Sequence, residues 1–354
     1  MDHSELKNLL LLQKHLPISP ISVADYSLYR MFFNQDDRDA AYANTFTYIT
    51  QACRAFGLGI KYVAGDLLYS IGAYRGHYVV VRPIGALDRG FVDMLDQLQT
   101  LSGKPVFIKK LFPDQTVALE RYSGFSLAMT VESGVPQPGR YVWDQYAYAD
   151  DDTYPELIYD AEVLVNHDLR IDHWGEIFSA RRAGLRAEEL KSFKHKMKNL
   201  NRAVYNLEKK WGKPYITRYT EDQATSVLKF LSAYFDGREE HFHAHLNVFT
   251  PPPDALESDY FNLISYIGID NLPVAYHVGE RIGADAVSFC IGVASKEIRL
   301  LAATIYLNLF EYLKPYAIRR VNIGGSETKS LHEFKRTPAP VEERYMAMVV
   351  YGVS

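Results

Sequence analysis

The segment from Val321 to Pro340, VNIGGSETKSLHEFKRTPAP, holds the residue types whose order most directly suggests chemistry. A short apolar run ends at Ile323 and is followed by Gly324 and Gly325. Paired glycines permit backbone conformations and close approaches that a side chain would block. We therefore expect a strand, a turn and a ligand contact, with polar side chains beyond the turn at Ser326, Glu327, Thr328 and Ser330. An ordinary strand-to-helix connection is the alternative interpretation.

Lys335 is the candidate catalytic residue of this segment. It follows Phe334 and lies between the glycine turn and Pro338, which limits how far its side chain can move. An ammonium group held in a cleft stabilises the negative charge that develops on a carbonyl oxygen during attack by a nucleophile. The same residues also fit a solvated surface lysine.

A basic segment lies between Lys191 and Lys213, where eight Lys and Arg residues stand against the single acid Glu208. Helical spacing places an apolar stripe on one face. That stripe comprises Phe193, Met197, Leu200, Val204 and Leu207. The opposite face presents a cationic row of Lys191, Lys194, Lys198 and Arg202, a pattern that suits phosphate groups. A solvated helix face is the alternative.

Two segments that contain histidine are further candidates. The run PVAYHVG predicts a strand on which Tyr276 or His277 faces the interior or a cleft. His277 is then a candidate proton acceptor. Tyr276 is a candidate substrate contact or a core residue. Three alternating histidines, His241, His243 and His245, lie in an expected loop before a proline run. We predict no metal site, although a metal-dependent enzyme built on these three imidazoles is a weaker hypothesis.

Composition narrows the class of protein. The 354 residues are 47% hydrophobic and 23% charged with a formal net charge of -4, which is typical of a soluble globular protein and not of a wholly basic nucleic-acid binder. The two cysteines, Cys53 and Cys290, form neither a disulfide framework nor a zinc cluster, which favours a reducing compartment such as the cytoplasm. The apolar run from Leu9 to Leu12 is too short for a membrane span. The sequence contains no nucleophile elbow, Walker loop or dinucleotide glycine motif.

Alternating helix and strand patterns indicate two α/β domains. The first half predicts helices over 40–56 and 87–101, a meander over 60–81 and a strand over 105–108. The second half repeats this order, with central strands at Val274 to Val278 and Val287 to Ile291, a helix over 297–313 and strands at 320–323 and 345–351. A Gly, Pro, Asp and Tyr-rich stretch places the boundary near Asp150, which gives domains 1–150 and 151–354.

The assembled segments resemble a known family. They are similar to Fem-type aminoacyl-tRNA-dependent peptidyltransferases and to the C-terminal domain of phosphatidylglycerol lysyltransferase and its relatives. The basic helix of that family resembles the stretch LKSFKHKMKNLNRAVYNLEKKWG. Its closing turn and Phe-Lys segment resemble VNIGGSETKSLHEFKRTPAPVEER. The central hairpin LPVAYHVGERIGADAVSFCIGVA and the first-half stretch NTFTYITQACRAFGLGIKYVAGDLLYSIGAYRG also match that pattern.

This resemblance implies an α/β fold of the α+β type: tandem GNAT-like acyltransferase domains, each a mixed central sheet flanked by helices. It implies an acyltransferase that moves an aminoacyl group from aminoacyl-tRNA, or another acyl group, onto a small-molecule or peptide amine. Phe334 and Lys335 would then lie at the reaction centre, and Lys194, Lys198 and Arg202 would hold donor phosphates. No permanently bound cofactor is expected.

Three departures from the family keep alternatives open. The pyrophosphate loop of acetyltransferases is not evident after SFCIGVA, which makes acyl-CoA the secondary donor. The membrane spans of the lipid-modifying enzymes and the Fem coiled-coil hairpin are also missing from this sequence. A non-catalytic binding protein that keeps the fold is therefore the alternative function.

Overall fold

The computed structural model describes most of the chain, in several ranges. These are residues 13, 16–36, 41–55, 59–74, 77–127, 129–132, 135–138, 154–161, 195, 198–199, 202, 204–236, 251–268, 272–298, 301–326, 329–336 and 340–352. The boundary predicted near Asp150 lies outside the described residues. So do Lys194, Glu327 and the histidines at 241, 243 and 245.

The first sheet has the strand order β1-β2-β3-β4-β5-β16-β6. Its strands are β1 (Ile18–Pro20), β2 (Ile60–Ala64), β3 (Leu67–Tyr74), β4 (His77–Ile84), β5 (Val106–Leu111), β6 (Phe125–Leu127) and β16 (Ala347–Tyr351). β2, β3 and β4 form an antiparallel meander, and β4 pairs with β5 in parallel. A separate antiparallel pair joins β7 (Met129–Glu132) to β8 (Val135–Pro138).

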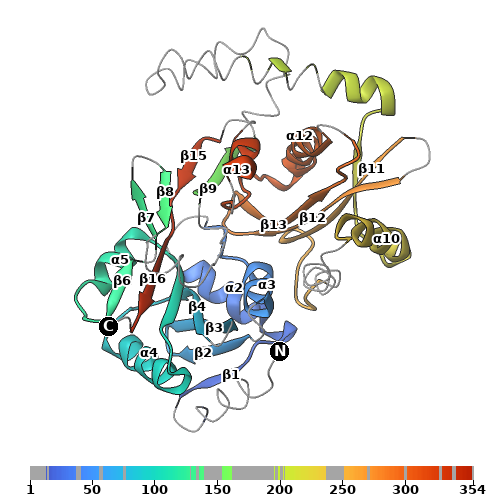
Figure 1. The fold of residues 1–354 in the computed structure, drawn as a ribbon. Coiled ribbons are helices and arrows are strands. Elements are labelled where there is room, and N and C mark those ends of the chain that lie inside the picture. The colour runs from blue at the N-terminus through green and yellow to red at the C-terminus, as the bar shows by residue number, and fades with distance from the viewer. Residues whose placement is uncertain are drawn as a thin grey trace.

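Helices cover both faces of this sheet (Figure 1). They are α2 (Tyr26–Gln35), α3 (Phe46–Ala55), α4 (Arg89–Ser102) and α5 (Pro113–Leu119). Side chains alternate between the faces as strand geometry requires: Val79 and Val81 pack with α2 and α3, whereas Val80 packs with α4. The ends of α4 are set locally, because Asp88 accepts a hydrogen bond from the Phe91 amide at 3.3 Å and a left-handed Gly103 follows the last turn.

The second sheet has the order β10-β11-β12-β13-β14-β9-β15. Its strands are β9 (Glu156–Asp160), β10 (Tyr215–Arg218), β11 (Tyr260–Ile267), β12 (Leu272–Arg281), β13 (Ala286–Ala294), β14 (Arg320–Asn322) and β15 (Glu342–Arg344). Helix α10 (Ala224–Tyr234) packs on one face and α12 (Leu301–Leu313) on the other. α13 (Lys329–Lys335) and the 3-10 turns η2 (Val23–Asp25), η4 (Glu221–Gln223) and η5 (Lys314–Tyr316) complete the named elements. The central strands predicted from sequence are confirmed as β12 and β13.

The two sheets share one plan, and the chain crosses between them. Each sheet consists of an antiparallel meander, a parallel pair and then an antiparallel strand, which is β16 beside β5 and β9 beside β14. The sequence pattern grouped the last strand with the second half, but the structure places β16 in the first sheet. Met348 and Val350 explain this position, because both are buried in the core formed with α2 and α3. The predicted fold class, two mixed sheets flanked by helices, is confirmed.

A buried carboxylate from the second sheet also caps a helix of the first domain. Glu280 of β12 accepts hydrogen bonds from the backbone amides of Phe46 at 3.0 Å and Thr47 at 2.5 Å, at the start of α3. The first amides of a helix have no partner within the helix and carry partial positive charge, so a carboxylate stabilises them. This contact fixes α3 against the second sheet.

Candidate active site

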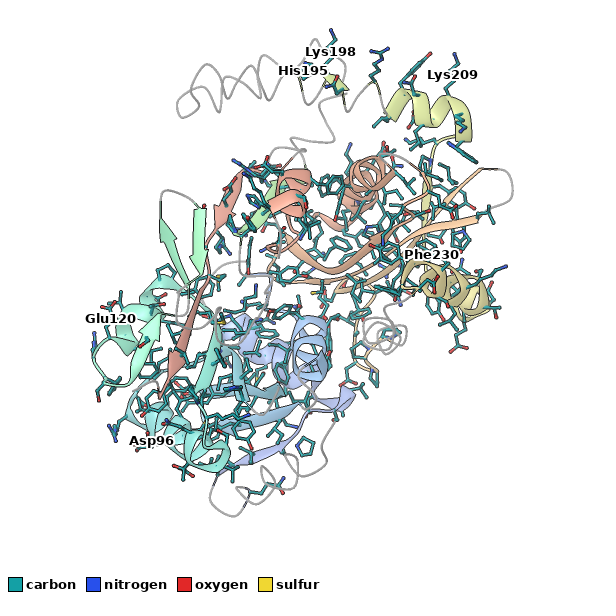
Figure 2. All side chains as sticks on the ribbon, viewed as in Figure 1. Asp96, Glu120, His195, Lys198, Lys209 and Phe230 are labelled. Atoms are coloured by element: carbon teal, nitrogen blue, oxygen red, sulfur yellow. The ribbon has the colours of Figure 1, made fainter. Side chains whose placement is uncertain are left out.

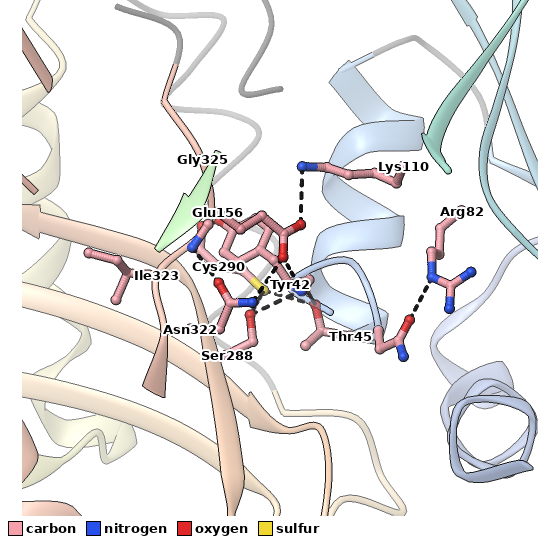
Figure 3. A network of polar contacts seen from close by, with 12 residues as sticks. Tyr42, Thr45, Arg82, Lys110, Glu156, Ser288, Cys290, Asn322, Ile323 and Gly325 are labelled. Atoms are coloured by element: carbon pink, nitrogen blue, oxygen red, sulfur yellow. Dashed lines mark hydrogen bonds and ion pairs between the residues drawn. The ribbon is translucent and has the colours of Figure 1, made fainter. Parts of the chain in front are cut away.

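Buried polar side chains join the two domains beside the glycine turn, and Figure 3 shows this seam. At its centre lies Glu156, the first residue of β9, which is 1% exposed. Its Oε2 accepts hydrogen bonds from the Tyr42 amide at 3.0 Å and from Asn322 Nδ2 at 2.9 Å. Its Oε1 lies 3.6 Å from the Nζ of Lys110, a fully buried residue of β5. One carboxylate therefore contacts both domains.

Tyr42 of the first domain contacts β13 of the second sheet. Its hydroxyl donates to the Cys290 carbonyl at 3.0 Å, and its own carbonyl accepts from Ser288 Oγ at 3.2 Å. Thr45 Oγ1 lies 2.9 Å from the sulfur of Cys290. Burial, chiefly, raises the pKa of the Cys290 thiol to about 12. The thiol therefore stays protonated at neutral pH and is a poor nucleophile.

The glycine turn forms where the sequence predicted it, and Tyr42 packs against it. Gly324 has a φ of +68°, and a Cβ built on it would lie 2.7 Å from the Tyr42 ring. Its amide donates to Asn322 Oδ1 at 2.8 Å. Ser326 is 1% exposed and pairs through its backbone carbonyl with the Tyr154 amide at 3.1 Å. The Tyr42 ring therefore fills the space beside Gly324.

Lys335 returns to this turn from the end of α13. Its ammonium donates to the carbonyl oxygens of Ile323 at 3.0 Å and Gly325 at 2.5 Å. Its own carbonyl accepts a hydrogen bond from the Tyr159 hydroxyl. Both Lys335 and the preceding Phe334 are half-buried. These contacts confine the ammonium to the seam instead of leaving it in solvent.

His332, one helical turn before Lys335, is a residue that sequence analysis did not single out. Its side chain is buried and its ring stacks on Tyr154 at 4.8 Å between ring centroids. Burial, chiefly, lowers the pKa of His332. The sequence signal that could have identified His332 is its position three residues before Lys335, because residues three apart lie on the same face of a helix.

Tyr276 and His277 lie apart from the turn, in the core of the second sheet. The His277 ring contacts those of Phe289 and Tyr306, with centroids 6.1 Å and 6.0 Å away. Tyr276 is fully buried on the α10 side, and burial raises the pKa of its hydroxyl well above the usual value. Both strand faces are covered by helices, so neither residue faces a cleft and the structure does not bring His277 to Lys335.

The basic segment is described only in part. Lys198 and Arg202 are exposed, and Leu207 of the predicted apolar stripe is buried against Ile267 and Leu301. Figure 2 shows Lys198 above the second sheet, well separated from α13, whose position Figure 1 gives. The structure does not place Lys198 beside α13 and its last residue, Lys335.

Neither a metal cluster nor a membrane helix occurs in the part of the chain that the structure describes. Within it, His, Cys, Asp and Glu side chains form no group of three that could hold a metal ion. None of its helices combines the length and apolar character that a membrane span requires.

Comparisons with solved structures identify the class of fold. A conserved protein of unknown function from Bacteroides thetaiotaomicron VPI-5482 has a TM-score of 0.69 at 14% identity, over 95% of this chain and 99% of that one. L-PGS from Bacillus licheniformis gives 0.55 at 12% identity, over 93% and 92%. FemX gives 0.55 at 8% identity, over 95% and 97%. No family model and no curated protein matches the sequence.

These likenesses show a shared fold across nearly the whole chain. Together with the two mixed sheets they confirm the predicted α/β class, with mixed sheets flanked by helices, in a fold similar to those of L-PGS and FemX.

Gly324→Ala should lower the free energy of unfolding by about 2–4 kcal/mol, because it combines left-handed strain with overpacking against Tyr42. Gly103→Ala is the matched control. Its φ is +65° and no heavy atom lies within 4 Å of its built Cβ, so only the strain of about 1–2 kcal/mol applies. Denaturant unfolding of both variants measures the difference, and equal losses would contradict the packing of Tyr42 on the turn.

The burial of His277 should lower the free energy of unfolding in acid. Burial lowers its pKa from 6.5 to about 4, so the unfolded chain binds a proton more readily than the folded protein between these pH values. The stabilisation is present above pH 6.5 and is lost as pH falls toward 4, by about 3 kcal/mol in total. His277→Leu should flatten this part of the profile of unfolding free energy against pH. Identical slopes in wild type and His277→Leu would refute the assignment.

Proposed function

We propose that this protein is an acyltransferase that moves an aminoacyl or other acyl group onto an amine. The observation that carries the proposal is the Lys335 ammonium, held by the carbonyls of Ile323 and Gly325 at the seam between two GNAT-like domains. The fold shared with FemX and with a putative lysylphosphatidylglycerol synthetase C-terminal domain from Agrobacterium fabrum, at a TM-score of 0.54, supports the same class of reaction.

In the proposed chemistry, Lys335 acts on the carbonyl of the donor. Attack by an amine forms the new C–N bond and places negative charge on the carbonyl oxygen, and a positive charge already fixed nearby stabilises this transition state more than the neutral ester. The ester C–O bond then breaks, and the tRNA hydroxyl leaves with the proton that the amine gives up, through water or directly. The two backbone carbonyls that accept from Lys335 restrict its motion, so little reorganisation is needed during the reaction. His277 has no part in this scheme because its ring is enclosed in the core.

The donor we propose is aminoacyl-tRNA, with acyl-CoA as the alternative. Lys194, Lys198 and Arg202 would hold its phosphates. Lys198 lies away from α13, so one donor molecule would have to contact the basic segment while its ester reaches Lys335. The acceptor would be a small-molecule or peptide amine, and we place the reaction in the cytoplasm.

The test is to offer the purified protein charged tRNAs and acyl-CoAs in parallel, each with a mixed pool of amines. Consumption of a donor that depends on added amine supports the proposal and identifies the donor class. A second candidate, a non-catalytic binding protein, is favoured by the packing of Tyr42 against the glycine turn. Binding of a donor without its consumption would support that candidate.

Lys335→Ala should lower turnover by about 10²–10³-fold, the usual effect of removing one group that stabilises an oxyanion. Lys335→Arg should restore only part of the activity, because the broader guanidinium places its charge differently. Lys329→Ala, at the exposed start of the same helix, is the control and should retain full activity. Donor consumption by Lys335→Ala at the wild-type rate would remove Lys335 from the mechanism.

Changing Lys194, Lys198 and Arg202 together to glutamine should weaken donor binding and flatten its dependence on salt, because fewer counterions are released on association. Binding titrations at several salt concentrations measure both effects. Folding should be retained, since the buried Leu207 on the apolar side of the segment is unchanged. An unaltered affinity and salt slope would indicate a merely solvated face.

A further inference from the structure

A continuous series of contacts runs from the first sheet to the turn that holds Lys335. It begins at Lys110 on β5, whose ammonium faces Glu156 Oε1. Glu156 Oε2 accepts from Asn322 Nδ2, and Asn322 Oδ1 in turn accepts from the amide of Gly324. The next residue, Gly325, provides one of the two carbonyls that bind the Lys335 ammonium.

The chemistry of Asn322 makes this link directional. A carboxylate can only accept hydrogen bonds, so the amide nitrogen of Asn322 must face Glu156, and the Gly324 amide can only donate, so the oxygen must face the turn. Neither aspartate nor leucine can satisfy both neighbours. Asn322 is 1% exposed, and water cannot readily replace either contact.

The backbone conformation of Lys110, where this series of contacts begins in the first sheet, supports a functional interpretation. Its φ is +61° although it is not glycine, and side-chain-bearing residues are retained in this region mainly where surrounding structure requires it. The charge is fully buried beside the rings of Tyr42 and Tyr48, 5.5 Å and 5.3 Å from their centroids. A strained, buried cation on β5 is thereby aimed at a carboxylate of the other sheet.

We propose that Lys110, Glu156 and Asn322 are positioning residues, through which the first domain sets the location of the Lys335 ammonium. This inference rests on the proposed function for its catalytic consequence. Lys110 neutralises Glu156, Glu156 orients Asn322, and Asn322 holds the turn whose carbonyls bind Lys335. The first domain is then a part of the reaction centre although it supplies no group to the reacting atoms.

The experiment compares Asn322→Ala with Asn308→Ala. Asn308 lies on α12 and, like Asn322, donates a hydrogen bond from its side-chain amide, but its acceptor is the backbone carbonyl of Pro214 at 3.1 Å, away from the turn. An amine-reactive reagent is applied to the native proteins, and labelling at Lys335 is followed by mass spectrometry with the exposed Lys213 as internal reference. Asn322→Ala removes the hydrogen bond to the Gly324 amide as well as that to Glu156. Loss of the hydrogen bond that holds the turn should make Lys335 label about tenfold faster, and Asn308→Ala should not have this effect.

A rescue experiment separates charge from shape. Lys110→Met leaves an uncompensated carboxylate at Glu156 and should accelerate Lys335 labelling. Adding Glu156→Gln removes that charge and keeps an oxygen for the Tyr42 amide and Asn322, so the double variant should return to within about twofold of wild type. A general loss of packing would not be reversed by the second substitution.

Turnover provides the final measurement, with the donor that wild type consumes. Asn322→Ala should lower kcat about tenfold and leave the KM for the donor unchanged, because the basic segment is untouched. Wild-type labelling in Asn322→Ala, or increased labelling with an unchanged kcat, would overturn the proposal. If wild type consumed no donor, the proposed function and the catalytic consequence would both fail, and labelling alone would still decide whether the link to Lys335 exists.

Discussion

The rest of this structure depends on the contacts that the buried carboxylate of Glu156 makes with both domains. It faces a lysine of one sheet and an asparagine of the other, and it accepts from the backbone just before α3. A buried charge is costly unless it is paired and hydrogen-bonded. The two domains must therefore approach in the one arrangement that supplies all of these partners.

Strand exchange makes that arrangement a property of the whole chain. β16 closes the first sheet after the chain has completed the second, and Glu280 of β12 caps α3. Neither domain has all of its hydrogen-bonding partners without the other. These contacts join the two domains through a buried polar seam, which Figure 3 shows.

Lysines in three environments show how position determines the role of one side-chain type. Lys198 is exposed, Lys110 is buried and faces a carboxylate, and Lys335 is half-buried and bound to backbone carbonyls. Only the last combines a fixed charge with a location beside the glycine turn. The same turn is packed by Tyr42, which limits its own room for a ligand.

The sequence by itself determined the local features: the central strands of both sheets, the helix near 87–101, the turn at Gly324 and the mixed α/β class. These follow from side-chain periodicity and from backbone preferences, which act over a few residues. Tertiary structure alone decided that β16 joins the first sheet, that His277 is enclosed, and that Glu156, Asn322 and Lys110 meet. Residues 110, 156 and 322 are far apart in the chain, and no local pattern encodes a contact that exists only after two sheets have packed together.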